Sequence, residues 1–506
     1  MKKSVSVLLL LSMMLGIVTS CSETVPEETD PVTETAPAET DAETTVTGET
    51  ERSQAKDDLP ELDFDGETVT ICYPNEKYYE QWDVIGADNS GDVIHDAIWR
   101  RNQTVEDRLD IRFNIVPTQG NNLQTLQDEM KNLAFTGSDD YDIVTGTANT
   151  IITQSLYSYM YELSDLKYLD ITKPWWRTSA IEELALEEGN FRFLMGDHTL
   201  NNYLKCGVVY YNKDIYTEVY GDPEEMYQTV LDGKWTYDKF TELTAGAYID
   251  KNGDGKENPG DTYGLMVPTG MYEAALHMVY GCDIDTYQRT ADRTIDLSPF
   301  NNERVFNTVE KINKLVRSTA GVFESDKGID SSLQYFSDNY ALFYTGRLSN
   351  AVNAVFREME SDYGILTMPK YDEAQQDYVS LIHTSTTVTC IPKAVAADRY
   401  DMLGAVLEAW AAEAYRSVIT PFIESAMKAK YSRDALSGQV IDIIFDDPII
   451  SFLDMYSSNT GSVLYTAVMD NIAQGTNTFS SSIASGLRGG QKVMDKYLSK
   501  VLESDS

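Results

Sequence analysis

Hydrophobic residues follow two different periods between residues 66 and 149. β-Branched or alternating runs at 67–73, 111–116 and 142–146 predict three short strands. Apolar residues three and four positions apart at 93–109 and 123–133 predict two amphipathic helices between those strands. Strands and helices that alternate at this spacing predict an α/β lobe with a parallel sheet. Because ligands bind beyond the carboxyl ends of such strands, residues 74–76 and 146–149 are the first candidate binding positions.

A second set of elements follows after residue 190. Apolar or β-rich runs predict strands at 191–194, 204–211, 263–267, 340–344, 363–366 and 379–392. Helical patterns cover 303–316 and 402–418, and the end of the chain is mostly helical. About 448 residues remain from Leu59 onward, which is more than one hydrophobic core supports, so we expect two or more lobes.

The N-terminus has the parts of a secretory signal peptide: Lys2 and Lys3, a short apolar run, and small residues before a cleavage point. The run is well short of the roughly 20 residues that cross a bilayer as a helix. Val18-Thr19-Ser20-Cys21 resembles the lipobox of bacterial lipoproteins, in which the cysteine becomes the lipidated first residue. We therefore predict a lipoprotein signal peptide at 1–20 and lipidation of Cys21. A plain secretory signal with a chance cysteine is the alternative.

Residues 21–58 predict a disordered acidic linker. This stretch is rich in Thr, Glu, Asp, Pro and Ala and has almost no large apolar residue. It cannot bury enough apolar area to offset the entropy of ordering the chain. A flexible tether directly after a lipidatable cysteine supports the lipobox interpretation.

The charge balance restricts the class of partner. Forty Lys and Arg side chains stand against 81 Asp and Glu, a formal net charge of −41. A surface this negative repels phosphate backbones, so we expect no nucleic-acid partner. Aromatic residues make up 11% of the chain, with 32 tyrosines, which suits an amphipathic ligand but also ordinary surfaces between domains.

Four cysteines lie beyond the lipobox, and none is spaced as CxxC, so a zinc or redox motif is not indicated. Three of them, Cys72, Cys206 and Cys390, lie in runs that are predicted strands. We expect buried free thiols, with a Cys72–Cys390 disulfide as the alternative.

Residues 250–261 match the spacing of an EF-hand calcium loop. Oxygen donors at positions 1, 3 and 5, a glycine at position 6 and a carboxylate at position 12 suit a hard cation. The candidate ligands are Asp250, Asn252, Asp254, Lys256 and Asp261. Asp261 is shorter than the usual Glu, and no pair of amphipathic helices flanks the loop. A structural Ca²⁺ and a metal-free acidic turn are both open, and no other cofactor is required.

Patterns of catalytic residues do not stand out in the chain. The four histidines form no HxxxH or HxH metal pair, and there is no GxGxxG or P-loop motif. With 81 acids, two carboxylates suited to glycoside hydrolysis can arise by chance. We therefore expect a protein that is not an enzyme.

Several pieces standing in order resemble the extracellular solute-binding proteins, family 1, of bacterial ABC importers. These pieces are Cys72-Tyr73-Pro74-Asn75, 96–102, 141–144, 170–176, 211–214, 340–347 and 363–370. The resemblance covers most of the chain from Gly66 to Leu498. It implies a two-lobed α/β, periplasmic-binding-protein-like fold of type II, in which discontinuous lobes are joined by crossing strands. We place lobe 1 at 59–194 plus 380–421 and lobe 2 at 195–379 plus 422–506.

The same resemblance implies a ligand cleft lined by loops that follow strands. The positions are Asn75, Glu76, Lys77, Tyr78, Tyr79, Gly146, Thr147, Asn149, Trp175, Trp176, Asn202, Lys205, Gly346, Arg347, His383 and Thr384. Carboxylate, amide and guanidinium groups form paired hydrogen bonds with hydroxyls, and aromatic faces stack on sugar rings. Trp175 and Trp176 have an alternative role as anchors of a loop against their own lobe. Lys205 lies among apolar residues and needs a partner.

The family implies a sugar or oligosaccharide ligand delivered to the permease of an ABC importer. We accordingly expect a monomer on the extracellular face of the cell membrane, held by its N-terminal lipid. The alternatives are a surface glycan-capture protein without a permease, a peptide-type receptor and, last, a glycoside hydrolase.

Overall fold

The computed structural model describes residues 52–75, 80–120, 123–152, 156–258, 260–268, 272–290, 294–325, 329–423, 435–476 and 478–503. All of them belong to one compact unit, Thr47–Ser506. The predicted signal peptide at 1–20, the lipidation site Cys21 and most of the linker at 21–58 lie outside the described residues.

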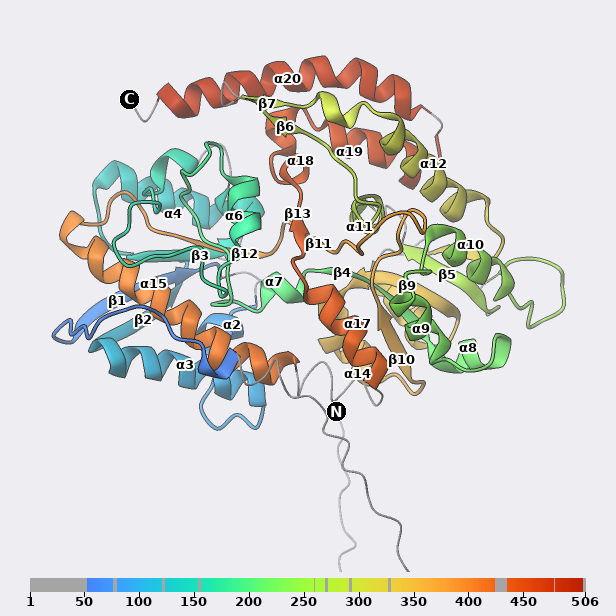
Figure 1. Cartoon of the computed structure of the whole chain (residues 1–506), viewed down its shortest axis with the longest axis horizontal. Coiled ribbons are helices and arrows are strands. Elements are labelled where there is room, and N and C mark those ends of the chain that lie inside the picture. The colour runs from blue at the N-terminus through green and yellow to red at the C-terminus, as the bar shows by residue number, and fades with distance from the viewer. Residues whose placement is uncertain are drawn as a thin grey trace, which may run out of the picture. The chain divides into compact units, whose positions relative to one another are not determined.

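The first sheet has four strands in the order β12-β3-β1-β2 (Figure 1). Its strands are β1 (Glu67–Tyr73), β2 (Ile111–Pro117), β3 (Ile143–Thr147) and β12 (Thr387–Cys390). β1 is parallel to β2 and β3, whereas β12 is antiparallel to β3. The predicted parallel α/β lobe is therefore confirmed, and a strand from much later in the chain completes its sheet.

Helices cover this sheet, and those at 93–109, 123–136 and 400–414 match predicted helical patterns. They are α2 (Trp82–Ile85), α3 (Val93–Leu109), α4 (Leu123–Thr136), α5 (Ala148–Ile151), α6 (Thr178–Leu184) and α15 (Tyr400–Ala414). The Asp92 carboxylate caps α3 by accepting the N–H groups of Ile94 and His95. The helix ends where Asp110 adopts a left-handed conformation, with φ of 45°.

The second sheet has five strands in the order β10-β4-β9-β5-β8. They are β4 (Gly207–Asn212), β5 (Tyr263–Pro268), β8 (Val322–Ser325), β9 (Ala341–Arg347) and β10 (Tyr363–Leu366). Surrounding helices are α8 (Lys213–Val219), α9 (Glu225–Leu231), α10 (Tyr237–Gly246), α11 (Tyr272–Tyr280), α12 (Glu303–Ser318), α13 (Ile329–Ser337) and α14 (Ala354–Arg357). The strands of the first sheet come from 59–194 and 380–421, the segments predicted as lobe 1. The strands of the second sheet come from 195–379, the first segment predicted as lobe 2.

Three segments run between the two sheets and lie side by side, which we call the crossing ladder. They contain Cys206, β11 (Leu381–Ile382) and β13 (Ile449–Ile450). The Leu348 N–H donates to the Cys206 carbonyl, Cys206 pairs with Ile382, and Ile382 pairs with Ile450. The order across the ladder is therefore Cys206, Ile382 and Ile450, and Leu348, which follows β9, lies beside Cys206.

The predicted strand at 204–211 begins later than expected. Residues 201–204 form the short helix α7 (Asn201–Leu204), and Lys205 follows that helix. The apolar pattern was misleading because Tyr203 and Leu204 are buried as helical residues beside the ladder.

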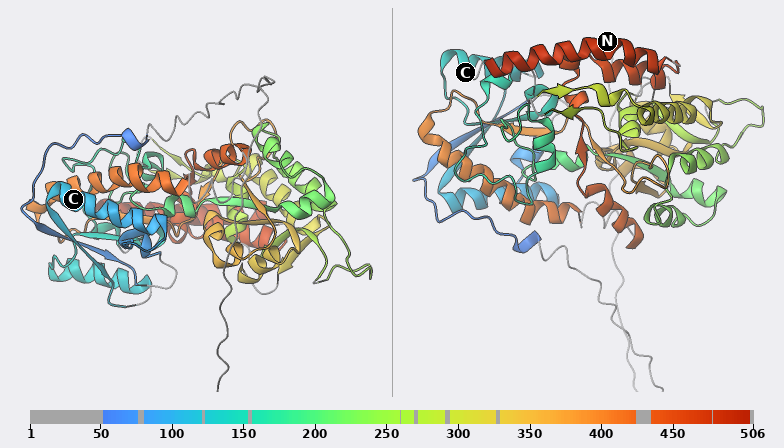
Figure 2. Two further views of the ribbon diagram at one scale, coloured as in Figure 1. Left: turned by 90° about the horizontal axis from the view of Figure 1, so that it is seen from below. Right: turned by 45° about the horizontal axis from the view of Figure 1, so that its top comes forward.

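The C-terminal region is helical, as predicted, and packs on β6 (Gln288–Arg289) and β7 (Ile295–Asp296). It comprises α17 (Ala435–Phe445), α18 (Phe452–Met455), α19 (Val463–Val468) and α20 (Phe479–Glu503). Figure 1 shows α20 as a long helix above α18, α19 and α12, and the right view of Figure 2 shows the same red helix along the top. Among the described residues, none of the helices combines the length and apolar character that a membrane crossing requires.

The four described cysteines are buried free thiols, as expected. Cys72 and Cys390 are both aligned with Val144, which lies on the strand between them. Two strand spacings amount to about 9.6 Å, beyond the roughly 7 Å limit for a disulfide. The alternative of a Cys72–Cys390 bridge is therefore wrong.

Candidate functional site

Polar side chains from five parts of the chain meet at the ends of strands facing the crossing ladder. We call this set the strand-end cluster; it consists of Glu80, Lys205, Glu273, Arg347, His383 and Ser385. Arg347 ends β9, Glu273 begins the helix after β5, and His383 follows β11. The carboxyl ends of β5 and β9 share one edge because these strands are parallel. Strand direction thus brings distant residues together.

An ion pair forms the centre of the cluster. The Arg347 Nε lies 2.6 Å from Oε1 of Glu273, and its Nη1 donates to the Ser385 hydroxyl at 3.2 Å. Burial alone would raise the pKa of Glu273, but the His277, His383 and Arg347 side chains together hold that pKa well below its ordinary value. Glu273 is therefore a carboxylate at neutral pH.

His383 approaches the same carboxylate from the crossing ladder. Its Nε2 lies 3.7 Å from Oε2 of Glu273, and its Nδ1 is 2.8 Å from the Ser385 hydroxyl. Burial lowers the pKa of His383 to about 4, so the imidazole is neutral at neutral pH. It can then donate or accept a hydrogen bond according to its tautomer.

Lys205 has the partner that the sequence required. The side chain is buried, and its Nζ donates to Oε1 of Glu80 at 2.6 Å. The backbone carbonyl of Lys205 accepts the His383 N–H at 3.0 Å, which ties two strands of the ladder together. The cluster therefore presents charged donors and acceptors held by short contacts.

His277 lies next to the cluster, with its Nε2 3.8 Å from Oε1 of Glu273. Its ring is 1% exposed, and neither ring nitrogen has a hydrogen-bond partner among the described residues. A Cβ on Gly207 would lie 2.0 Å from the His277 Nδ1, so only glycine lets β4 start against this ring. Nearby, the Tyr272 hydroxyl donates to Asp454 at 2.8 Å, and burial raises the pKa of Asp454 to about 6.

Four predicted residues at the first sheet lie near the strand ends in different settings. Asn75 is exposed, and its N–H donates to Thr118. Asn149 is exposed, and its N–H donates to the Thr384 carbonyl at 3.0 Å. Gly146 and Thr147 are buried in β3. Glu76, Lys77, Tyr78 and Tyr79 lie outside the described residues.

Three further predicted residues, Asn202, Gly346 and Thr384, contact the backbone or side chains around the cluster. Asn202 is fully buried, donates to the Gly196 carbonyl and accepts the Thr386 hydroxyl at 2.9 Å. Gly346 faces Asn350, whose Oδ1 would lie 2.4 Å from an added Cβ. The Asn350 Oδ1 accepts the Arg347 N–H at 2.8 Å, which fixes the end of β9, and the carbonyl of the buried Thr384 accepts the Asn149 N–H.

Trp175 and Trp176 lie in the core beneath α15 rather than on an open surface. Their exposed fractions are 1% and 4%, and both indole N–H groups donate to the buried Glu408 carboxyl, at 3.2 and 2.9 Å. Burial raises the pKa of Glu408 to about 7. The structure thus places them in the alternative role, as anchors within their own lobe.

The predicted calcium loop closes on itself through hydrogen bonds. Asp250 accepts the N–H groups of Gly253 and Gly255, whose φ angles of 70° and 74° suit glycine. Asp261 is fully buried and accepts the Asn258 N–H at 3.0 Å. Across the part of the chain that the structure describes, no group of three or more His, Cys, Asp or Glu side chains is placed to hold a metal.

Sequence reasoning missed Glu80, Glu273 and Ser385. Glu273 was within reach, because it stands four residues before His277 in an otherwise apolar helix and so shares its face. Glu80 and Ser385 carry no local signal, since only the folded chain brings them to Lys205 and Arg347.

No family model and no curated protein matches the chain. Solved structures do match. A cyclo/maltodextrin-binding protein complexed with maltotetraose has a TM-score of 0.54 at 12% identity, covering 85% of this chain and 97% of that one. An ABC transporter solute-binding protein from Thermotoga lettingae bound with α-D-tagatose has a TM-score of 0.51 at 14% identity, covering 85% and 100%.

UgpB from Mycobacterium tuberculosis in complex with glycerophosphocholine also matches, with a TM-score of 0.52 at 12% identity over 79% of this chain and 95% of that one. The chain therefore has the two-lobed type II fold of ABC-transporter solute-binding proteins. The resemblance predicted from its sequence motifs is confirmed at the level of this fold.

Proposed function

We propose that this chain is an exported, lipid-anchored solute-binding protein. It captures a sugar or oligosaccharide between its lobes and delivers it to the permease of an ABC importer. It acts by binding and not by catalysis, and its Cys21 lipid holds it at the extracellular face of the membrane.

The strand-end cluster is the observation that carries this proposal. Arg347, Lys205 and Glu273 offer charged donors and acceptors at the edges where ligands of α/β sheets bind. Charge-assisted hydrogen bonds of this kind are short and strong, and they suit a ligand rich in hydroxyl groups. The neutral imidazole of His383 adds a group that can face either a hydroxyl hydrogen or a hydroxyl oxygen.

A titration of the soluble chain against a panel of glycans tests the proposal. Binding should shift tryptophan fluorescence and raise the melting temperature with increasing ligand, because a ligand that binds only the folded state stabilises it. Peptides form the parallel arm. If peptides shift both signals and no glycan does, the chain is a peptide-type receptor.

Two further alternatives have their own readouts. Release of reducing ends from a bound glycan would indicate a glycoside hydrolase. A glycan that binds but is not imported by cells carrying the chain would indicate a surface capture protein without a permease.

The lipid anchor is tested separately by labelling cells with a radioactive fatty acid. The wild-type chain should carry label and sediment with membranes, whereas the Cys21→Ser chain should carry none and be released. Labelling of the serine variant would overturn the assignment of Cys21.

We also propose a structural Ca²⁺ in the 250–261 loop. The backbone of this loop already folds around Asp250, and Asp254 accepts the Lys256 N–H at 2.8 Å. Carboxylate and carbonyl oxygens of this loop are of the kind that Ca²⁺ prefers. The metal would order the loop and take no part in ligand binding.

A further inference from the structure

Residues 52–58, at the end of the predicted linker, are docked on the first lobe, and we call this segment the strap. Asp57 anchors it: the side chain is 3% exposed and accepts two hydrogen bonds from Arg108 of α3, at 2.6 and 2.7 Å. Arg416 donates to the Ala55 carbonyl at 3.2 Å. Figures 1 and 2 show the strap in blue, passing along the outside of the first lobe beside α3 and α15. The strap is therefore part of the folded body.

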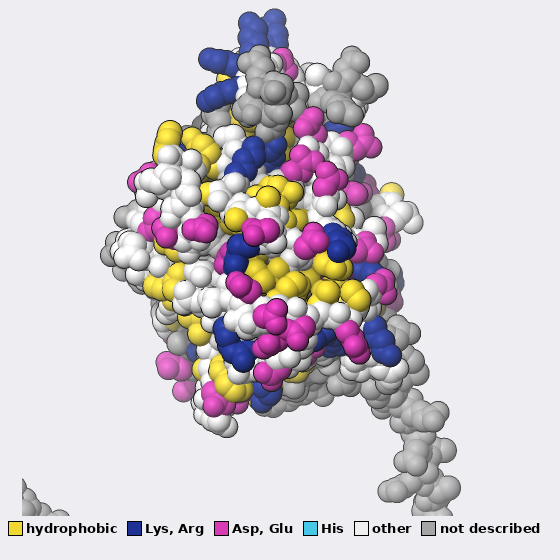
Figure 3. All heavy atoms as spheres, turned by 90° about the vertical axis from the view of Figure 1, so that its left-hand side faces the viewer, with side chains coloured by type: hydrophobic (Ala, Val, Ile, Leu, Met, Phe, Trp, Pro, Cys, Tyr) yellow, Lys and Arg dark blue, Asp and Glu magenta, His cyan; other side chains and the backbone are white. Residues whose placement is uncertain are grey.

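A second ion pair beside this anchor joins Lys173 to the exposed Asp58. Figure 3 shows that Asp and Glu side chains are interspersed with Lys and Arg side chains over the outer end of the first lobe. On such a mixed surface, water and competing charges weaken each pair, so exposed pairs contribute little to stability. The docked position of the strap therefore depends mainly on the buried Asp57.

At the other end of the strap, Arg52 reaches the first crossing segment. Its guanidinium lies 5.0 Å from the centre of the Tyr415 ring and donates a hydrogen bond to the Tyr203 hydroxyl. That hydroxyl in turn donates to the buried Asp197 carboxylate at 2.9 Å. Burial alone would lower the pKa of Arg52, but the Tyr203 and Asp197 side chains raise it. Arg52 is therefore a charged donor that fixes the Tyr203 hydroxyl.

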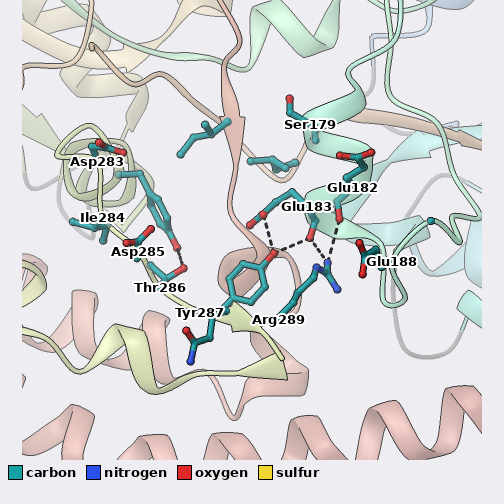
Figure 4. A pocket seen from close by; sticks show the side chains of 16 residues that line it. Ser179, Glu182, Glu183, Glu188, Asp283, Ile284, Asp285, Thr286, Tyr287 and Arg289 are labelled. Carbon is teal, nitrogen blue, oxygen red and sulfur yellow. Dashed lines mark hydrogen bonds between the residues drawn. The ribbon is translucent and has the colours of Figure 1, made fainter. Parts of the chain in front are cut away.

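A second arginine, Arg177, also holds Tyr203. Its guanidinium lies 4.4 Å from the centre of the Tyr203 ring, a cation–π contact. Arg177 directly precedes α6, and the other end of that helix is fixed in turn, because Arg289 donates to the Glu183 carbonyl at 2.9 Å (Figure 4). Tyr203 thus contacts two guanidinium groups, one next to a fixed helix and one from the strap.

Tyr203 belongs to α7, which carries Lys205 into the strand-end cluster. The Lys205 N–H donates to the Asn201 carbonyl at 3.0 Å, and the Cys206 N–H donates to the Tyr203 carbonyl at 3.1 Å. The Lys205 Nζ donates to Glu80 at 2.6 Å. A shift of Tyr203 therefore moves both Lys205 and the first segment of the crossing ladder.

We propose that Arg52 is a positioning residue of the ligand site. The strap fixes Tyr203, Tyr203 fixes α7, and α7 aims the Lys205 ammonium at the cluster. The binding unit therefore begins at Arg52 and not at Leu59, the predicted start of lobe 1. The inference rests on the proposed function only where it concerns the ligand.

The test measures the reactivity of the Lys205 ammonium without any ligand, in a Cys21→Ser chain. A short pulse of acetic anhydride modifies lysines whose amino group is free, and mass spectrometry reads each site. In R52Q, Lys205 should react about tenfold faster than in the parent, because its pair with Glu80 opens more often. A rate at Lys205 equal to that of the parent overturns the proposal.

Two controls separate positioning from general loosening. Lys56→Gln removes a positive charge from an exposed position of the same strap and should leave Lys205 as it is in the parent. Lys370 is the reference inside each chain, because it is 3% exposed and its Nζ donates to the Gln375 carbonyl at 2.9 Å in the second lobe. If the reactivity of Lys370 rises together with that of Lys205, Arg52 serves only general stability and the proposal fails.

The affinity readout rests on the proposed function. For a glycan found in the panel, R52Q should bind about fivefold more weakly than the parent, and K56Q should bind like the parent. Unchanged affinity together with faster modification of Lys205 overturns the link from the strap to the ligand site. If no glycan binds at all, the proposed function fails, while the reactivity of Lys205 still decides whether Arg52 positions it.

Discussion

Replacing Arg347 with alanine would leave the Glu273 carboxylate without the guanidinium that lies 2.6 Å from it. A hydrogen bond to a charged group contributes about 1.5–3 kcal/mol, and breaking a fully buried ion pair costs about 3–5 kcal/mol. The Arg347 and Glu273 side chains retain exposed fractions of 24% and 23%, so water can partly solvate the carboxylate. We expect the free energy of unfolding to fall by about 2 kcal/mol.

A double-mutant cycle separates two costs: the lost Arg347–Glu273 interaction and the Glu273 charge that is left without a partner. Glu273→Gln removes the charge, so the double variant E273Q/R347A should lose less stability than the sum of its two parents. The coupling should be about 1–2 kcal/mol. Urea unfolding followed by tryptophan fluorescence measures it, as a shift of the midpoint at constant slope.

The same variants separate stability from binding. Arg347→Ala should weaken binding of the glycan found in the panel by about tenfold or more, or about 1.4 kcal/mol. The exposed Arg357→Ala in the same lobe is the matched control and should change neither quantity. Additive losses in the cycle, or parental affinity in R347A, would refute the assignment of Arg347 to the centre of the site.

The other predictions concern Lys205, the core carboxyl Glu408 and the calcium loop. Lys205→Met should lower the free energy of unfolding by about 1–2 kcal/mol, because it leaves Glu80 unpaired. The double variant K205M/E80Q should regain most of that stability. If urea unfolding shows the same loss in the single and the double variant, the two side chains are not a pair. Burial raises the pKa of Glu408 from 4.5 to about 7, so the folded state holds a proton that the unfolded chain releases. The free energy of unfolding of the wild-type chain should therefore fall as pH rises from about 4.5 to about 7. Glu408→Gln has no such carboxyl, so its free energy of unfolding should fall by about 3 kcal/mol less over the same range. Urea unfolding at pH 5 and pH 8 measures both. EDTA should lower the melting temperature of the wild-type chain but not of Asp250→Asn, and a wild-type melting temperature indifferent to EDTA would remove the metal.

Elements with a strong period were predictable from the sequence. The strand at 67–73 and the helix at 93–109 match β1 and α3 because their apolar positions face one core and nothing else competes. The short helix α7 was not predictable, since the buried amide groups of Asn201 and Asn202 donate to Thr387 and to the Gly196 carbonyl, and Asn202 also accepts the Thr386 hydroxyl. Tertiary hydrogen bonds decided its conformation.

Predictability of the site follows the same division. Lys205 was marked by its own surroundings, since a charge amid apolar residues requires a partner. The identity of that partner, Glu80, depends on how two distant segments meet. The sequence pattern left two roles open for Trp175, a ligand contact and a core residue, because it does not show which side of the loop is covered. In the structure its indole N–H donates to the buried Glu408, which places Trp175 in the core.

The position of β12 in the first sheet has a consequence for how the protein is made. β3 is flanked on one side by β1 and on the other only by β12, and the whole second sheet is encoded between β3 and β12. Until that later strand arrives, the buried edge of β3 offers unpaired N–H and C=O groups to any other extended chain. The sheet of the first lobe is therefore complete only after residue 390 has been synthesised, when all strands of the second sheet are already present. A fragment ending before residue 387 should aggregate where the complete chain stays in solution.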